Sequence, residues 1–243
     1  MRQRGNERGW ALLDALLDNE TGPGLAALTA TVLGLPEAGR YAVAVMAPRG
    51  CPGPVRRTTG AHGLRFLWRP RQDREIAVVA LGEADPAAAA AHLTDRVPGP
   101  GGVSPAVEGL ADLGRARRLA DAALLTCGPG RADFVCLDGR IPAALVAGQP
   151  TVSAHLATDV FGPLLAREPA DRALLVSTLD AWLECGGSAG RAAVRLCCHR
   201  NTVLNRLRRL EELTSRSLSR PRELVEVVLA LDAVRVLPGG GAV

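Results

Sequence analysis

The stretch "RLCCHRNTVLNRLRRLEEL", residues 195–213, decides the fold of the second half of this chain. It opens with two adjacent cysteines and a histidine, and continues with arginine and leucine at helical spacing. With Leu207 at the centre of a buried face, Val203, Leu204 and Leu210 lie within about 60° of it, at ~100° per residue. Polar side chains point away: Asn201, Thr202, Asn205, Arg208 and Arg209, with Arg206 on the flank. The pattern predicts a helix over about 199–213 with a polar, arginine-rich outer face.

The residues on either side predict three more helices. "DRALLVSTLDAWLECGG" (171–187) has Leu174, Leu175, Leu179, Trp182 and Leu183 on one side and ends in a glycine pair, which is typical of a helix C-terminus. Ser188 can cap a short helix, "AGRAAVRL", whose small residues allow a close crossing. Cys197 to His199 then form a break, and Pro221 starts a closing helix. A short helix, a tight turn and a longer helix form a helix-turn-helix unit.

The charge of this unit favours DNA as its partner. Six arginines and no acidic residue lie between Gly186 and Arg209. Arginines and helix N-terminal amides can bind phosphates, and Asn and Arg can read base edges in the major groove. An ordinary helical hairpin with a solvated basic face remains the alternative. The candidate DNA-binding residues are Ser188, Arg191, His199, Arg200, Asn201, Thr202, Asn205, Arg206, Arg208 and Arg209.

The first part of the chain alternates strands and helices. The pattern predicts two N-terminal helices in 10–35, a buried strand at 40–48, a loop at 49–63, a hairpin of "LRFLWR" and "EIAVVALG", a helix after Asp85–Pro86, a helix at 110–127 and a strand at 132–138. Only helical patterns follow from Ile141. We therefore expect an α+β chain: a mixed-sheet α/β domain in 1–140, a helical linker in 141–170 and an all-α domain in 171–238. The glycine-rich segments 98–102 and 127–130 are expected to be turns.

The C-terminal part of the sequence resembles a known protein family. "WLECGGSAGRAAVRLCCHRNTVLNRLRRLEELTSRSL" is similar to the C-terminal helix-turn-helix domain of the PucR/CdaR-type bacterial transcription regulators. The resemblance implies a Fis-like fold that binds double-stranded DNA, usually as a homodimer or higher oligomer. Members generally have a longer side chain, often Tyr, at the place of Asn205, and aliphatic residues at Cys197 and Cys198. "LAALTATVLGLPEAGRYAVAVMAP" and "GGVSPAVEGLADLGRARRLADAALL" resemble the GGDEF-like domain that precedes it.

A nucleotide cyclase or nucleotide-binding domain is one alternative for the first domain. A cyclase of the GGDEF type needs carboxylates to hold magnesium ions and a glycine-rich hairpin to receive the nucleotide. The hairpin here has no Gly-Gly-acid-acid run, and Asp73 and Glu75, flanking Arg74, are expected to be solvated turn charges. We therefore predict a degenerate domain without catalytic residues or cofactor, which serves oligomerisation or binds an unknown small-molecule effector.

A thiol- or metal-responsive switch at Cys197, Cys198 and His199 is a second alternative. Zinc requires four ligands as a rule, and no distant Cys or His pair offers itself in the sequence. We therefore expect the two cysteines to pack as compact, largely buried side chains where the helices cross.

The remaining expectations concern location. No apolar run approaches the ~18 residues of a membrane span, and the polar N-terminus lacks the apolar centre of a signal peptide. We expect a cytoplasmic protein, associated with the nucleoid when bound to DNA and with no membrane partner.

Overall fold

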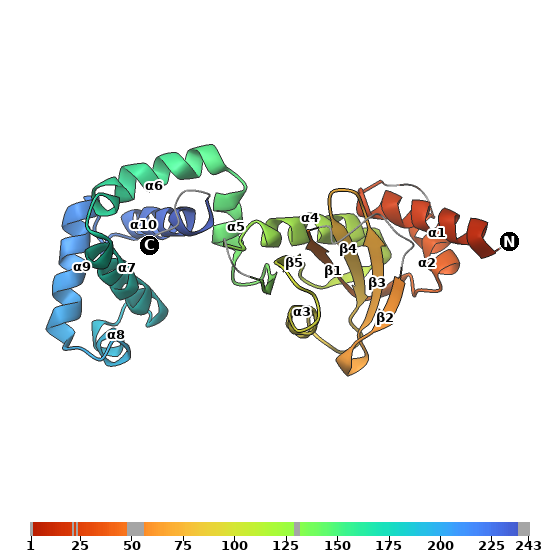
Figure 1. Ribbon diagram of the computed structural model, residues 1–243, viewed down its shortest axis with the longest axis horizontal. Helices are drawn as coiled ribbons and strands as arrows, with labels where there is room; N and C mark the ends of the chain where they lie inside the picture. Colours follow the sequence, from red (N-terminus) through yellow and green to blue (C-terminus); the bar gives the residue numbers. More distant parts are fainter. Residues whose placement is uncertain (1, 21, 23, 48–55, 129–131, 238–243) are drawn as a thin grey trace. The chain divides into compact units, whose positions relative to one another are not determined.

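The fold comes from a computed structural model, which describes residues 2–20, 22, 24–47, 56–128 and 132–237 (Figure 1). The chain divides into two compact units, Met1–Leu145 and Val146–Val243. The first contains a mixed sheet with helices, and the described part of the second is built from helices alone, so the predicted α+β class is confirmed. No helix in the described part of the chain has the length and apolar character needed to cross a membrane.

The sheet of the first unit has the strand order β2-β3-β4-β1-β5-β7, with β6 also paired to β1. All its pairings are antiparallel except the parallel pairing of β5 with β7. The strands are β1 (Ala38–Met46), β2 (Arg56–Thr59), β3 (Arg65–Pro70), β4 (Glu75–Ala80), β5 (Gly101–Val103), β6 (Val107–Gly109) and β7 (Phe134–Cys136).

Strand β1 is the centre of this unit. Its residues from Tyr41 to Met46 are all buried, because helices cover both faces of the sheet. Strands β5 and β6 pair end to end along one edge of β1. Between them, Ser104 continues the pairing: its Oγ accepts from the N–H of Val43 at 3.0 Å, and its own N–H donates to the Val43 carbonyl at 2.9 Å. The buried strand predicted at 40–48 is confirmed, beginning two residues earlier.

The predicted hairpin is also confirmed, with β3 and β4 paired from Arg65↔Ala80 to Pro70↔Glu75. Two expectations about its surroundings were wrong. Glu75 is 4% exposed rather than a solvated turn charge, because it is the first residue of β4. The expected loop 49–63 contains the edge strand β2, whose short polar sequence carries no alternation of apolar residues; its residues 49–55 lie outside the described residues.

The glycine-rich turn expected at 98–102 is wrong at its end, because Gly101 and Gly102 form part of β5. A Cβ on Gly102 would lie 2.1 Å from the carbonyl oxygen of Ala120 and 2.4 Å from the backbone N of Leu124. A Cβ on Gly101 would lie 2.2 Å from the Phe134 ring. These glycines therefore let a helix and a neighbouring side chain approach the strand closely, rather than bend the chain. Of the turn expected at 127–130, residues 129 and 130 are outside the described residues.

Helices pack on both faces of the sheet (Figure 1). One face is covered by α1 (Arg2–Leu17), α2 (Leu25–Leu33) and α4 (Leu113–Leu124), and the other by α3 (Pro86–Thr94). Helix α1 begins at Arg2, well before Trp10, where the apolar pattern starts. Helix α3 begins as predicted, with the Asp85 side chain accepting from the N–H of Ala88 at 2.7 Å. It ends at Thr94.

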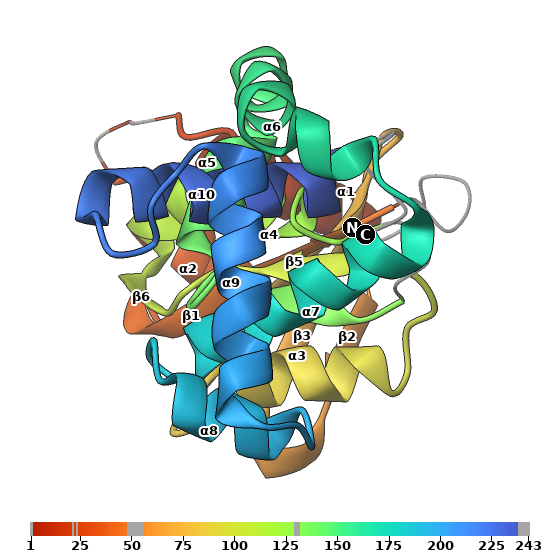
Figure 2. The same ribbon diagram turned by 90° about the vertical axis from the view of Figure 1, so that its left-hand side faces the viewer.

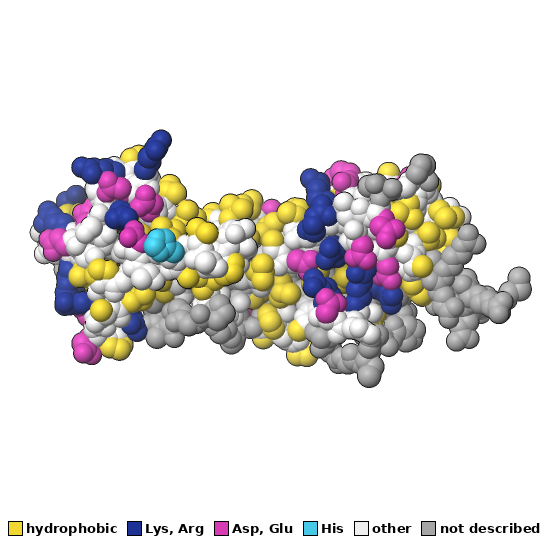
Figure 3. All heavy atoms as spheres, turned by 90° about the horizontal axis from the view of Figure 1, so that it is seen from above, with side chains coloured by type: hydrophobic (Ala, Val, Ile, Leu, Met, Phe, Trp, Pro, Cys, Tyr) yellow, Lys and Arg dark blue, Asp and Glu magenta, His cyan; other side chains and the backbone are white. Residues whose placement is uncertain are grey.

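A half-buried ion cluster attaches α1 to the hairpin. Asp14 of α1 accepts hydrogen bonds from Arg69 of β3, at 2.6 Å, and from Arg71 of the turn, at 2.9 Å. Arg71 also pairs with Asp18 at 2.8 Å. Figure 3 shows positive and negative side chains interspersed on one face of this unit. Burial opposes ionisation of Asp14, but the two arginines outweigh it and hold the pKa of its carboxyl below the usual 3.8.

The second unit has one hydrophobic core. Residues of the segment 141–170, which was expected to be a helical linker, contribute to this core. Phe161 and Leu164 of α6 are 1% exposed and pack in the same cluster as Val203 and Leu207. The stretch 141–170 therefore supplies core residues of the second unit, because α6 has its own apolar face. The helices beyond the first unit's α4 are α5 (Ile141–Ala147), α6 (Pro150–Leu165), α7 (Pro169–Glu184), α8 (Ala189–Arg195), α9 (Arg200–Thr214) and α10 (Pro221–Val236).

Replacing Gly102 with Ala should destabilise the first unit by about 3 kcal/mol, because the new Cβ meets backbone atoms that cannot move aside. Chemical denaturation followed by tryptophan fluorescence measures this loss. The matched control is Gly22→Ala, whose nearest neighbour is the Leu25 Cβ at 4.0 Å and which should change stability by less than about 0.5 kcal/mol. Equal effects of the two substitutions would contradict the close approach.

Replacing Asp14 with Asn should lower the stability of the first unit at neutral pH by on the order of 1–2 kcal/mol. The carboxylate has a lowered pKa in the folded state, so its contribution is present above the unfolded pKa of about 3.9 and is lost as pH falls through the folded value. Denaturation curves of wild type and variant should therefore converge below about pH 3.9. A difference that stays constant from neutral to acid pH would exclude an ionic contribution.

Candidate nucleic-acid interface

The junction between α7 and α8 is made by two glycines in the left-handed region. Gly186 has φ 60° and Gly187 φ 78°, and their N–H groups donate to the carbonyls of Leu183 and Trp182. These bonds end α7, as the glycine pair predicted. Ser188 follows at once, and its Oγ accepts from the N–H of Arg191 at 3.3 Å, which confirms the predicted cap of α8. Ser188, expected at the DNA, is thus occupied in capping.

The turn from α8 to α9 uses a left-handed cysteine. Cys197 has φ 50°, and the N–H of Cys198 donates to the carbonyl of Ala193 at 3.0 Å, which closes the last turn of α8. The expectation that both cysteines are largely buried was wrong for Cys197, which is exposed; Cys198 is half-buried against the core. A residue at this left-handed position projects outward because the chain reverses direction there.

His199 caps α9. Its Nδ1 accepts a hydrogen bond from the backbone N–H of Asn201 at 3.2 Å. The His199 side chain is exposed, and the first exposed side chain within the helix is Arg200. Helix α9 then runs to Thr214, one residue beyond the predicted end.

The buried face of α9 agrees with the periodicity of the sequence. Val203, Leu207, Leu210 and Thr214 are between 0% and 6% exposed, and Leu204 is half-buried. The crossing with α8 is made by Ala192 and Ala193, which are 0% and 5% exposed. Small side chains at this crossing let the two helix backbones approach, as the alanine-rich sequence predicted. On α7, Leu174 was placed on the buried side but is 41% exposed.

The opposite face of α9 brings most of the predicted residues together. Arg200, Asn201, Asn205, Arg208 and Arg209 are exposed, and Thr202 and Arg206 are half-buried on its flanks. Figure 2 shows α9 in front, with no described element covering this side of it within the unit. Arg208 Nη1 lies 3.4 Å from Asn205 Oδ1, which holds a guanidinium and an amide side by side. Arg191, on α8, is exposed as well.

Ion pairs divide the arginines of this region into two groups. Arg209 pairs with Asp171 of α7 at 2.7 Å, and Asp171 also pairs with Arg167 at 3.1 Å. Arg195 pairs with Glu184 at 2.5 Å. The other arginines have no carboxylate within ion-pair distance among the described residues. They are Arg191, Arg200, Arg206 and Arg208.

The pairing of Arg209 was missed from the sequence. Asp171 and Arg209 are 38 residues apart and on different helices, so no local pattern joins them. The spacing of Arg167 and Asp171, four residues apart, does indicate a pair on one helix face. Arg209 therefore links α9 to α7 through this ion pair. Its side chain is also exposed, as the sequence predicted.

The structure offers little for the two alternatives. In the part of the chain that it describes, no three His, Cys, Asp or Glu side chains are grouped to hold a metal ion, and Cys197, Cys198 and His199 form no such group. Near the hairpin turn, Asp73 pairs with Arg74 at 2.7 Å, and Asp121 pairs with Arg74 and Arg117 at 2.5 and 2.8 Å. The hydrogen bond from Arg74 holds the pKa of the Asp73 carboxyl below its usual value. These carboxylates are neutralised by arginines of the same unit.

Comparison with known proteins assigns both halves of the chain. Residues 175–233 match the PucR C-terminal helix-turn-helix domain, and residues 19–126 match the GGDEF-like domain. The chain therefore carries a PucR-type helix-turn-helix domain behind a GGDEF-like domain. The two matches together cover well over half of its length, and they agree with the resemblance drawn from "HRNTVLNRLRRLEELT".

Relatives extend this assignment. A segment of 73 residues is 37% identical to the purine catabolism regulatory protein of Bacillus subtilis and covers 30% of this chain and 14% of that protein. A segment of 83 residues is 37% identical to an uncharacterized protein of Mycobacterium tuberculosis and covers 34% of this chain and 19% of that protein. The matched part is thus less than a fifth of the length of these relatives. A crystal structure of a regulator of polyketide synthase expression from Bifidobacterium adolescentis aligns over 92% of this chain and 95% of that one, with 22% identity and a TM-score of 0.41.

Replacing Cys197 with Gly should stabilise the second unit by about 1 kcal/mol, because glycine adopts φ 50° without the strain of a Cβ. The neighbouring Cys198→Gly, at a position with ordinary φ and packed against the core, should destabilise it. Thermal unfolding of both variants measures the two signs. If the two substitutions changed stability in the same direction, the assignment of the left-handed turn to Cys197 would be wrong.

Proposed function

We propose that this PucR-type chain is a transcriptional regulator that binds double-stranded DNA by inserting α9 into the major groove. The observation that supports this most strongly is the outer face of α9. It combines amide and guanidinium side chains, and its Arg200, Arg206 and Arg208 have no carboxylate partner among the described residues. In DNA-binding units of this kind the second helix of the pair enters the groove, and arginine and asparagine are the side chains that best read guanine and adenine.

The positions along α9 suggest a division of roles. We assign Arg200, at the helix N-terminus, and Arg191, on α8, to phosphate contacts. Asn201, Thr202, Asn205 and Arg208 form the outward row that meets base edges, with Arg206 at its flank. His199 and Ser188 act through the caps that they provide, and Arg209 acts from its ion pair with Asp171.

The remaining parts of the proposal concern assembly and location. A regulator that reads a symmetric operator presents two recognition helices, so we propose that the chain works as a homodimer or higher oligomer in the cytoplasm, at the nucleoid when bound. The first unit would provide oligomerisation or effector sensing. We do not assign it an enzymatic activity, because its hairpin carries paired rather than free carboxylates.

The central test uses a DNA fragment selected from a genome-wide binding experiment with the full chain. Replacing Arg208 with Ala should weaken binding by about 1–3 kcal/mol if it reads a base, and should alter the preferred sequence at one position. Replacing Arg200 with Ala should weaken binding on all sequences alike and reduce the dependence on salt by about one phosphate contact. Fluorescence anisotropy at several salt concentrations measures both.

The matched control is Arg222→Ala on α10, which makes the same change of charge in the same unit at an exposed position away from α9. It should leave affinity and sequence preference unchanged. If Arg208→Ala and Arg200→Ala bound the selected fragment as tightly as this control does, α9 would not be the recognition helix.

A further inference from the structure

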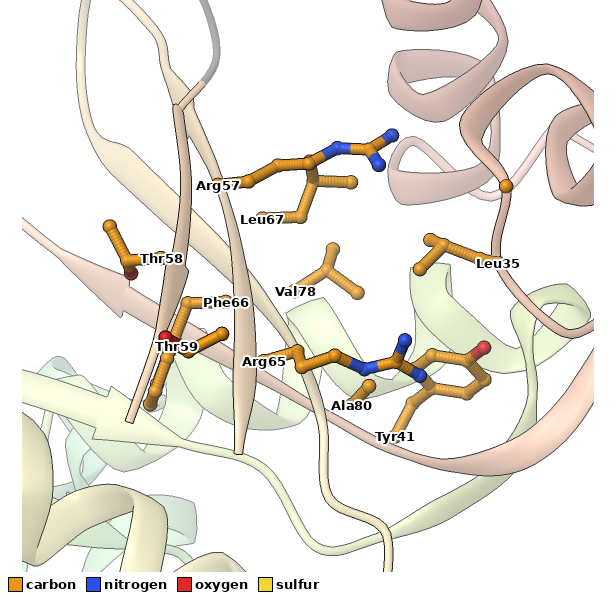
Figure 4. Close-up of a pocket in the computed structure, with 11 residues that line it drawn as sticks. Leu35, Tyr41, Arg57, Thr58, Thr59, Arg65, Phe66, Leu67, Val78 and Ala80 are labelled. Carbon is orange, nitrogen blue, oxygen red and sulfur yellow. The ribbon is translucent and has the colours of Figure 1, made fainter. Parts of the chain in front are cut away.

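A pocket opens on the face of the sheet that α1, α2 and α4 cover, beside the edge strand β2 (Figure 4). Side chains of a strand alternate between faces, so Arg57 and Thr59 of β2 share this face with Arg65 and Leu67 of β3, their neighbours across the sheet. Helix α2 covers the centre of the face but ends at Leu33, where Gly34 in the left-handed region turns the chain away. The result is a pocket of about 350 Å³.

The floor of this pocket is apolar and fixed. It is made by Leu67, Val78 and Ala80, which are at most 9% exposed, and by Leu35 at one wall. The Tyr41 ring closes the end, held in place because its hydroxyl donates to the Pro36 carbonyl at 2.6 Å. Such a floor can exclude water from a ring or a short chain.

The rim carries positive charge without a counter-charge. Arg57 and Arg65 extend over the floor from two adjacent strands, and Figure 4 shows the Arg65 side chain reaching across toward Tyr41. Arg57 Nη2 donates to the Leu33 carbonyl at 2.5 Å, and no further acceptor of this guanidinium lies among the described residues. Among the described residues, neither guanidinium has a carboxylate within ion-pair distance, and no acidic side chain lines the pocket. The arginines at the other end of the hairpin, Arg69, Arg71 and Arg74, all have such partners.

We infer that this pocket binds a small organic anion, with its acid group between Arg57 and Arg65 and its apolar body on the floor of Leu67, Val78 and Ala80. A guanidinium pairs bidentately with a carboxylate or a phosphate, so both acid groups fit the rim. The volume is at the lower end of the range of about 300–1,000 Å³ for small-molecule sites, which suits a body of one or two rings or a short chain. This site is distinct from α9, and ligand binding there does not depend on whether the chain binds DNA.

The test is calorimetric titration of the full chain, without DNA, against four probes: 1-naphthoate, octanoate, adenosine monophosphate and inorganic phosphate. At least one of the three organic anions should bind one to one with a Kd below about 1 mM, and inorganic phosphate should bind at least about tenfold more weakly. Which organic probe binds distinguishes a carboxylate ligand from a phosphate ester. Failure of all three, or equal binding of inorganic phosphate, would overturn the inference.

Two variants locate the binding. Arg65→Gln removes one of the two unpaired charges, and Thr59→Trp fills the mouth from an exposed edge position while keeping both arginines. Each substitution should raise the Kd of the probe that binds at least about tenfold. Arg118→Gln, an exposed change of the same charge on α4, is the matched control and should bind as wild type does. Thermal unfolding verifies that the variants fold. Binding that survives both pocket variants would place the anion elsewhere and contradict this site.

Discussion

The close crossing of α8 and α9 is the constraint on which the candidate interface depends. Ala192 and Ala193 of α8 are buried in the same core cluster as Val203 and Leu207 of α9. With a larger side chain at either alanine, the helices would separate and α9 would rotate or shift. The outward direction of Asn205 and Arg208 is therefore set from the buried side of the helix, by packing that involves no polar atom.

The periodic parts of this structure could be predicted from the sequence. The period of leucine and valine in α9 places its buried face, the glycine pair ends α7, and Ser188 begins α8. The central strand β1 and the hairpin of β3 and β4 also follow from runs of apolar residues bounded by breakers. In each case the signal is local, because it depends on residues within one or two turns or strands of each other.

The features that could not be predicted depend on contacts between distant segments. Gly101 and Gly102 read as a turn, and only the approach of α4 and Phe134 explains why glycine is needed within a strand. Strand β2 is short and polar, and it forms because its backbone pairs with the edge of β3. Cys197 reads as a compact apolar residue, yet the reversal of the chain turns its side chain outward. The pocket beneath Arg57 and Arg65 likewise requires the end of α2, which no property of those two strands indicates.

The pair of Arg209 with Asp171 has a consequence for how α9 meets any polyanion. The Arg209 guanidinium is already paired with the Asp171 carboxylate. A phosphate that bound Arg209 would therefore gain only the difference in free energy between the two ion pairs, and Asp171 would keep Arg167 as its one partner of the two. The electrostatic attraction of Arg209 for an anion is thus reduced by its ion pair, whereas that of Arg200 and Arg208 is not reduced in this way. The ion pair therefore lowers the attraction of the helix for polyanions in general and leaves the exposed amides and the unpaired guanidiniums unchanged. In the proposed complex with DNA, general electrostatic affinity and base reading would thereby fall to different residues of a single helix.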